Sequence, residues 1–473
     1  MISASSVRLV MTALMAFMMA MTTARHLQST KHHARSTILS PAADPFYNPP
    51  VGYESEVPGT ILRQRNISAA VFGIIKDPVK VYQLLYRTTA VNGSAITTVT
   101  TVFKPSYGKK DRFISFQTAY DSLYSACEPS YNYQFGANET ELISAAETLI
   151  LQAYLLLGYT VASSDYEGQE AAFGAGRLAG MAVLDNMRAV SAFKPLGFTT
   201  DTPKIVGIGY SGGAIAASWG AALQPTYAPE LDIKGWVSGG TPANLTATML
   251  SFNDGEYGGF IPIALAGMSQ PSAYGATLAP LLDQILTSDG RTKIEYAKTH
   301  CAADNIGNLF FQSMLSTDFQ TLGEAFLTNT VFTDIMEDCL LVGNKTETPT
   351  SPMLIYHSAV DEIIPYAPAK VLADTWCDNG AGIEFITFAN GGHITTDVIG
   401  LPYAIEFTAS AFEGNLTKGC TRKTQLESVL NPISLATNLE PLGTDLISII
   451  VDLGKGDSNL KNNVAALKQL VHI

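Results

Sequence analysis

The feature that most constrains this chain is a serine set between glycines, in the sequence Gly209-Tyr210-Ser211-Gly212-Gly213. The apolar residues before it (205–208) predict a short buried strand, and the small residues after it (214–220) predict a helix that packs closely on a sheet. A serine at such a sharp strand-to-helix corner needs an unusual backbone conformation, for which the flanking glycines leave room. This corner is typical of a catalytic nucleophile, and a glycine-rich turn with an incidental serine is the simpler alternative.

The same corner can stabilise a negatively charged oxygen. We expect the hydroxyl of Ser211 to project above the sheet and the backbone N–H of Gly212 to point into the same space. The N-terminus of the following helix adds the positive end of its dipole there.

The composition describes a compact globular protein. The 473 residues are 47% hydrophobic and 15% charged, which is enough apolar material for a large core. The formal net charge of -13 argues against nucleic acid and anionic membranes as partners.

The N-terminus predicts secretion. An uncharged apolar run from Leu9 to Met21 follows Arg8 and ends in small residues, so we expect residues 1–24 to be a signal peptide. A buried N-terminal helix is the alternative. The run is too short to span a bilayer, and no other stretch approaches the necessary length, so the protein is expected to be released without an integral membrane anchor. The polar and basic residues 25–43 are interpreted as a spacer or pro-segment.

Two further features agree with an extracellular location. Six sequons predict glycosylated surface loops, at Asn66, Asn92, Asn138, Asn244, Asn344 and Asn415. The odd number of cysteines allows at most two internal disulfides and leaves one thiol, among Cys127, Cys301, Cys339, Cys377 and Cys420. Their spacing excludes a CxxC redox or zinc motif.

Alternating strand and helix patterns predict a mostly parallel sheet covered by helices on both faces. Together with the serine corner, this arrangement indicates an α/β-hydrolase fold. We assign the core to residues 44–240 and 353–420, and the C-terminal residues 421–473 to a tail or flap. The alternation stops within 241–352, where apolar, helical-looking stretches predict a cap or lid over the C-terminal edge of the sheet. These stretches are 260–267, 278–286, 309–315 and 323–341.

A serine nucleophile needs a base and an acid that orients the base, and in this fold they follow the serine in the order acid, histidine. His393 follows the predicted strand 383–388 and fits the base, whereas His300, His357 and His472 are better explained as structural or terminal. Asp361 follows the preceding strand and is the predicted acid, with its neighbour Glu362 as the alternative.

The loop after the early strand 112–117 is expected to complete the oxyanion hole. A backbone N–H of this loop, together with the Asp121 side chain if its carboxyl group is protonated, could donate to the oxyanion, and an aspartate that only caps a turn is the alternative. A second acidic pair, Asp165 and Glu167, ends another strand and is interpreted as structural because no further acidic site supports a glycosidase.

Several motifs together resemble the fungal secretory lipases. Besides the serine corner they are Tyr120-Asp121-Ser122, Ser164 to Gly168, Ser238 to Pro242, Asp361 to Tyr366 and His393. The resemblance runs from Phe46 to about Cys420. It implies a triad of Ser211, Asp361 and His393, an oxyanion hole of Asp121 and Gly212, disulfides Cys127–Cys301 and Cys377–Cys420, and a free Cys339. The sequence departs from the pattern at Tyr166, Ile215 and Val360, none of which removes a predicted catalytic group.

The sequence therefore predicts a secreted triacylglycerol lipase that acts on lipid at an oil–water interface and requires no metal or cofactor. A short-chain carboxylesterase or another acyl hydrolase of the same fold is the first alternative, and a non-catalytic binding protein is the second. The apolar residues expected to hold an acyl chain are Phe260, Ile261, Ile263, Leu265 and Met268.

Overall fold

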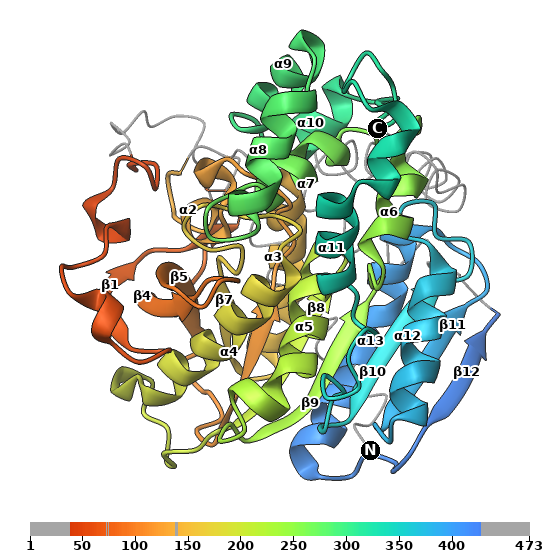
Figure 1. The fold of residues 1–473 in the computed structure, drawn as a ribbon. Coiled ribbons are helices and arrows are strands. Elements are labelled where there is room, and N and C mark those ends of the chain that lie inside the picture. The colour runs from red at the N-terminus through yellow and green to blue at the C-terminus, as the bar shows by residue number, and fades with distance from the viewer. Residues whose placement is uncertain (1–37, 72, 74, 138–140, 427–473) are drawn as a thin grey trace, which may run out of the picture.

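The computed structural model describes residues 38–71, 73, 75–137 and 141–426 (Figure 1). The predicted signal peptide, the sequon at Asn138 and almost all of the predicted C-terminal tail lie outside these residues.

A ten-stranded sheet forms the centre of the molecule, in the order β1-β4-β5-β7-β6-β8-β9-β10-β11-β12. Across the sheet, the neighbouring pairs from β1 to β7 are antiparallel. All pairs from β7 through β6 to β12 are parallel. The strands are β1 (Ile61–Ile67), β4 (Lys80–Thr89), β5 (Ala95–Lys104), β6 (Arg112–Gln117), β7 (Thr160–Ser164), β8 (Lys204–Tyr210), β9 (Ile233–Gly239), β10 (Met353–Ser358), β11 (Ile383–Phe388) and β12 (Thr421–Gln425). A separate small pair consists of β2 (Ala70–Val71) and β3 (Ile75–Lys76).

Helices cover both faces of the sheet, as the alternation predicted. Successive strand residues point to opposite faces, so Phe113 and Ile205 belong to one core and Ile114 and Val206 to the other. The first core packs on α4 (Gly176–Ala192), α5 (Gly212–Tyr227) and α12 (Tyr366–Asp378). The second packs on α3 (Leu142–Leu156) and α13 (His393–Glu413). The remaining short elements are η1 (Pro45–Tyr47) and η2 (Tyr53–Ser55) before the first strand, and η3 (Ser125–Cys127), α2 (Pro129–Asn132) and η4 (Lys194–Leu196) in later connections.

The residues between β9 and β10 form a helical group with its own apolar core, which includes Ile261, Leu278 and Phe326. Helices α7 to α10 of this group gather at the top of Figure 1. Its elements are α6 (Leu245–Phe252), α7 (Phe260–Met268), α8 (Gly275–Ile285), α9 (Ser288–Ala297), α10 (Ala302–Asn308), η5 (Gly323–Thr328) and α11 (Thr330–Asp338).

Two details of the predicted layout were wrong. Residues 309–315 form turns instead of a helix, because the left-handed backbone of Phe311 (φ 56°) cannot continue a right-handed helix. The segment assigned as a tail begins with a sheet strand, since β12 pairs in parallel with β11.

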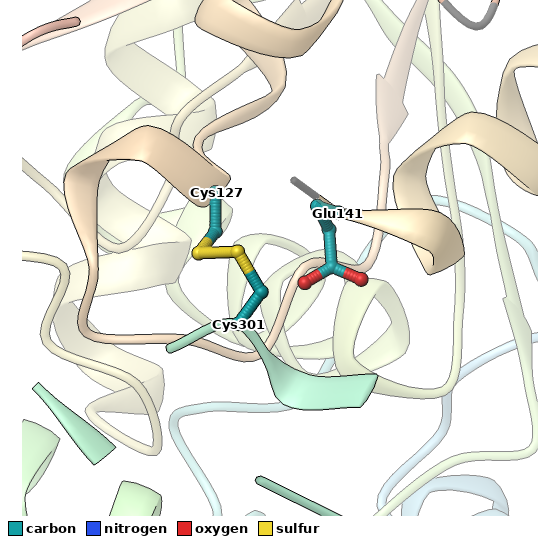
Figure 2. A group of neighbouring side chains, drawn as sticks. All are labelled: Cys127, Glu141 and Cys301. Carbon is teal, nitrogen blue, oxygen red and sulfur yellow. A yellow bond between two sulfur atoms is a disulfide. The ribbon is translucent and has the colours of Figure 1, made fainter. Parts of the chain in front are cut away.

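Both disulfides implied by the family resemblance are present. Cys127 is bonded to Cys301 and Cys377 to Cys420. Cys339 is free and buried, and burial raises the pKa of its thiol to about 12, so it is a poor nucleophile. Figure 2 shows Glu141 beside the Cys127–Cys301 bond. Because both sulfur atoms are used in the disulfide, this group lacks the thiolates that would make it a metal site.

Candidate active site

Ser211 occupies the predicted corner between β8 and α5, with φ 52° and ψ -120°. This conformation is strained for a residue with a side chain, and the neighbouring glycines make the corner possible. A Cβ atom on Gly209 would lie 2.1 Å from the carbonyl oxygen of Gly213, and one on Gly213 would lie 1.9 Å from that of Gln117. Close backbone approach therefore explains why glycine stands at both positions.

His393 and Asp361 are brought together from different loops at one edge of the sheet. His393 Nδ1 lies 2.7 Å from Asp361 Oδ2, and both side chains are enclosed. The backbone N–H groups of Ile363 and Ile364 donate to Asp361 Oδ1 at 3.0 and 2.8 Å. Glu362, the alternative acid, accepts a hydrogen bond from the backbone N–H of His393 at 2.9 Å, whereas the imidazole Nδ1 pairs with Asp361.

The contact between these two side chains changes the pKa of each. Burial favours the neutral acid, but His393 and the backbone donors outweigh it and lower the pKa of Asp361. Burial likewise disfavours a charged imidazole, but Asp361 outweighs it and raises the pKa of His393. Asp361 is therefore the ionised partner, and it strengthens His393 as a base.

The other imidazole nitrogen of His393 is unoccupied. Nε2 is buried and has no hydrogen-bond partner among the described residues, so no direct bond joins it to the Ser211 hydroxyl. The ring nevertheless lies beside the serine corner, because its centroid is 5.0 Å from that of Tyr210 and the Tyr210 hydroxyl donates to the His393 carbonyl at 2.6 Å. A Cβ atom on Gly240 would lie 2.7 Å from His393 Cε1, so this glycine gives the ring its space.

Asp121 lies against the N-terminus of α5. Its backbone is also left-handed (φ 45°), and its Oδ1 is buried without a hydrogen-bond partner in the described structure. Burial raises the pKa of Asp121 to about 7, although the positive charge of His393 opposes this shift. A carboxyl group with such a pKa can carry the proton that an oxyanion donor needs.

A glutamate that the sequence analysis missed holds the loop of Asp121. Glu147 on α3 accepts a hydrogen bond from the backbone N–H of Ala119 at 2.8 Å, and Ser144 donates to the Ala119 carbonyl at 3.1 Å. Nothing in the local sequence separates Glu147 from a solvated helix residue, because its partner is distant along the chain.

Asp165, from the acidic pair interpreted as structural, is held in place by Ser130. Its carboxylate accepts hydrogen bonds from the backbone and side chain of Ser130.

An apolar pocket lies between the serine corner and the helical group. It encloses about 540 Å³ including its open mouth, and Ser211, Gly212 and Asp121 are among its lining residues. Most of the remaining lining is apolar, from Phe173, Ile215, Leu245, Met249, Phe252, Phe260, Ala264, Met268, Ile363 and Ile364. The pocket therefore combines a largely apolar wall with polar groups at the serine.

Only part of the predicted acyl-binding set faces this pocket. Phe260 and Met268 line it together with Ala264, as expected for positions four residues apart on α7. Ile261, Ile263 and Leu265 are not among its lining residues and pack within the apolar core of the helical group, so this pocket does not support their assignment to the acyl chain, which stays a prediction. The sequence identified the helix but not which of its faces meets the pocket.

The predicted glycosylation sites are largely accessible where the structure describes them. Asn66, Asn92, Asn344 and Asn415 are exposed. Asn244 is half-buried, and its side chain caps α6 by accepting from the backbone N–H of Ala247 at 3.0 Å. Glycosylation itself stays a prediction.

Comparison with known proteins gives consistent matches. The family model "Secretory lipase" matches residues 133–419. "Secreted triacylglycerol lipase LIP1" of Malassezia furfur is 36% identical over 410 residues, which cover 86% of this chain and 83% of the relative. "Secreted triacylglycerol lipase LIP3" of Malassezia restricta is 34% identical over 96% of both chains. "Lipase 4" of Candida albicans is 35% identical over 86% of this chain and 92% of the relative.

Solved structures support the same fold. Candida antarctica lipase A in its closed state is 28% identical, with a TM-score of 0.76 over 88% of this chain and 96% of the other. A mutant of the rice cell wall degrading esterase LipA from Xanthomonas oryzae, at 16% identity and a TM-score of 0.58, matches in fold alone. Within the residues that the structure describes, no helix has the length and apolar character to cross a membrane.

Proposed function

This chain belongs to the secretory lipase family, and we propose that it is a secreted triacylglycerol lipase in which Ser211, His393 and Asp361 form the catalytic triad. The observation that carries this assignment is the 2.7 Å contact between His393 Nδ1 and Asp361 Oδ2 beside a strained serine corner. The contact fixes the proton on Nδ1 and leaves a lone pair on Nε2, which is the form that a general base requires.

The first half of the reaction forms an acyl-enzyme. Ser211 Oγ attacks the ester carbonyl carbon while His393 Nε2 takes the hydroxyl proton, and the carbonyl π electrons move to the oxygen. The tetrahedral intermediate then collapses, the bond to the alcohol oxygen breaks, and His393 returns the proton to the leaving alcohol. Nε2 has no competing partner in the described structure, so it is free to accept the Ser211 proton when substrate binding brings the two groups into contact.

The second half repeats these steps with water as the nucleophile. His393 takes a proton from water, the resulting hydroxide attacks the acyl carbon, and the bond to Ser211 Oγ breaks as the proton returns to it. The products are a free fatty acid and the enzyme in its starting form. The chemistry calls for no metal or cofactor.

The oxyanion is stabilised by the backbone N–H of Gly212 and by the protonated carboxyl group of Asp121. Both groups line the pocket beside Ser211. Burial, which raises the pKa of Asp121 to about 7, favours the protonated form below neutral pH. Donors fixed in this way favour the transition state because they need not reorient when charge develops.

The apolar pocket holds the acyl chain. Its wall on α7 is formed by Phe260, Ala264 and Met268, and the lining around Ser211 is largely apolar, as suits a hydrocarbon chain. Burial of the chain's methylene groups would stabilise binding by about 0.8 kcal/mol for each group. The expected substrate is therefore a neutral lipid presented at an oil–water interface, and the protein acts outside the cell.

The decisive experiment compares hydrolysis of triglyceride emulsions with hydrolysis of soluble short-chain esters by the purified protein. We expect activity on both, with higher specific activity once triglyceride exceeds its solubility, and none above background for Ser211→Ala. Activity on soluble esters alone would identify a carboxylesterase with the same mechanism. A folded protein that neither hydrolyses esters nor reacts with a serine-directed phosphonate would point to a binding protein.

A further inference from the structure

A second histidine contacts the carboxylate of Asp361. His357, near the end of β10, is completely buried, and its Nε2 lies 3.3 Å from Asp361 Oδ2. The same nitrogen lies 3.0 Å from the carbonyl oxygen of Ile364. From its place at a strand end His357 is predicted to be structural, because nothing in the sequence shows that the turn after β10 returns to it.

The neighbours of His357 determine where its proton lies. The backbone N–H of Thr241 donates to His357 Nδ1 at 3.2 Å. Because a backbone amide can only donate, Nδ1 must carry a lone pair, and the proton of the neutral ring is therefore on Nε2. That proton faces two acceptors, the Ile364 carbonyl and Asp361 Oδ2.

The Asp361 carboxylate is thus surrounded by donors. Oδ1 accepts from the backbone N–H groups of Ile363 and Ile364, and Oδ2 faces the N–H groups of His393 and His357. A carboxylate with this many donors has one preferred orientation.

The contact also links Asp361 to the neighbouring strands. Thr241 follows β9, and its hydroxyl lies 2.7 Å from that of Ser238. The Ser238 hydroxyl in turn lies 2.9 Å from that of Ser218 on α5. His357 therefore connects the acid loop to a polar chain that begins on the helix after the serine corner.

We propose that His357 is a positioning residue of the triad, which orients the Asp361 carboxylate through its Nε2–H and moderates the pull of that carboxylate on His393. This role rests on the proposed function, since it has meaning only if Asp361 and His393 act on Ser211. His357 does not touch the substrate or the reacting atoms.

The surroundings keep His357 neutral while the triad works. The groups that face it are Asp361, His393 and the ring of Tyr366, whose centroid is 5.9 Å away. Burial lowers the pKa of His357, Asp361 opposes this shift, and the charge of His393 adds to it. A proton on Nδ1 would also face the Thr241 N–H, so protonation would replace a hydrogen bond with two opposed donors.

Removing the His357 donor should therefore shift the pKa of His393 in a defined direction. A carboxylate with one donor fewer is more basic and attracts the His393 proton more strongly, so the pKa of His393 should rise. The acidic limb of the kcat profile should move to higher pH. Loss of orientation should lower kcat with little change in KM, because the acyl pocket is untouched. At metal-bound histidines, loss of an outer hydrogen-bond partner costs about 10- to 100-fold, and we expect about tenfold here.

Three variants of the full-length protein separate this role from simple packing. His357→Leu removes both nitrogen contacts. His357→Gln places an amide N–H near the position of Nε2 and can still donate to Asp361, whereas His357→Asn can replace Nδ1 but is too short to reach the carboxylate. The kcat, KM and pH profile of each variant are measured on a soluble ester, and circular dichroism and thermal melting establish that the variants are folded.

We expect His357→Leu and His357→Asn to lose about tenfold in kcat with an acidic limb at higher pH, and His357→Gln to recover most of both. Equal kcat values and acidic limbs for Asn and Gln would overturn the proposal, and this comparison stands even if the Leu variant does not fold. Ser211→Ala, measured in parallel, distinguishes a failure of the proposed function from a failure of the positioning role. If it retains full activity, the proposed function is wrong, whereas its inactivity beside a normal His357→Asn variant would refute the positioning role alone.

Discussion

The carboxylate of Asp121 occupies the space beside Gly212 that any other residue would fill with a side chain. A Cβ atom at residue 212 would lie 1.7 Å from Asp121 Oδ1. Because Gly212 has no side chain, the carboxyl group of Asp121 can lie at the N-terminus of α5. The proposed oxyanion hole depends on this pair, and two predictions follow from it.

Gly212→Ala should abolish most of the activity, because the new methyl group displaces Asp121 or tilts the start of α5. Loss of one oxyanion donor typically lowers kcat by about 10²- to 10³-fold, and we expect a loss in that range. Gly307→Ala is the matched control, since a Cβ atom there meets nothing within 4 Å. The kcat on a soluble ester measures both variants, and equal activity of Gly212→Ala and the parent would contradict the proposed oxyanion hole.

Asp121→Asn should extend activity to higher pH. The wild-type enzyme requires a neutral His393, which is gained as pH rises, and a protonated Asp121, which is lost as pH rises through about 7. An asparagine amide donates at every pH, so the alkaline limb that Asp121 produces should disappear. Asp121→Ala, which has no donor at this position, should instead have a low kcat at every pH. The pH dependence of kcat tests this, and an unchanged alkaline limb in Asp121→Asn would show that Asp121 does not donate as an acid.

Substitutions on the pocket face of α7 should change chain-length preference in opposite directions. Ala264→Leu adds atoms to the pocket and should lower the ratio of kcat/KM for long-chain over short-chain esters, by roughly tenfold or more because one methylene in an apolar site changes rates by about 10- to 200-fold. Met268→Ala enlarges the pocket and should raise the ratio. Ile261→Val is the control, because Ile261 packs in the core of the helical group. A ratio that none of these variants alters would place the acyl chain elsewhere.

Glu141 should make the protein less stable as pH rises. Burial raises the pKa of Glu141 to about 8, whereas its unfolded value is about 4.3. Between these values the folded state binds the extra proton, so the free energy of unfolding falls as pH increases, by up to about 1.4 kcal/mol per pH unit for this group. Glu141→Gln removes the titration and should flatten the dependence of Tm on pH from 5 to 8. Glu324→Gln, an exposed control, should leave the dependence of Tm on pH unchanged. If Glu141→Gln also leaves this dependence unchanged, Glu141 does not bind the extra proton in the folded state.

The sequence predicts those parts of the site whose residues lie close together in the chain or follow the strands in a fixed order. The serine corner is visible because Gly209 and Gly213 are required by backbone contacts only a few residues away or on the adjacent strand. The pairing of Asp361 with His393 follows from their order after two late strands, and the structure has this contact at 2.7 Å.

The parts that it did not anticipate depend on contacts between distant segments. His357 and Glu147 resemble ordinary strand and helix residues until the fold brings them to Asp361 and Ala119. Strand β12 was missed because its sequence, Thr-Arg-Lys-Thr-Gln, is polar, as suits the edge of a sheet. The pocket-facing side of α7 could not be predicted, because every residue of this helix is buried and its sequence shows no polar side.

The Cys127–Cys301 bond limits how the helical group can move. Cys127 lies just after the loop that carries Asp121, and Cys301 immediately precedes α10. If lipid entry requires the roof of the pocket to open, the segment around Cys301 must stay tethered to the core and act as a pivot. The swing would then be greatest in the helices farthest from this tether, while the floor that carries Asp121 keeps its shape through each catalytic cycle.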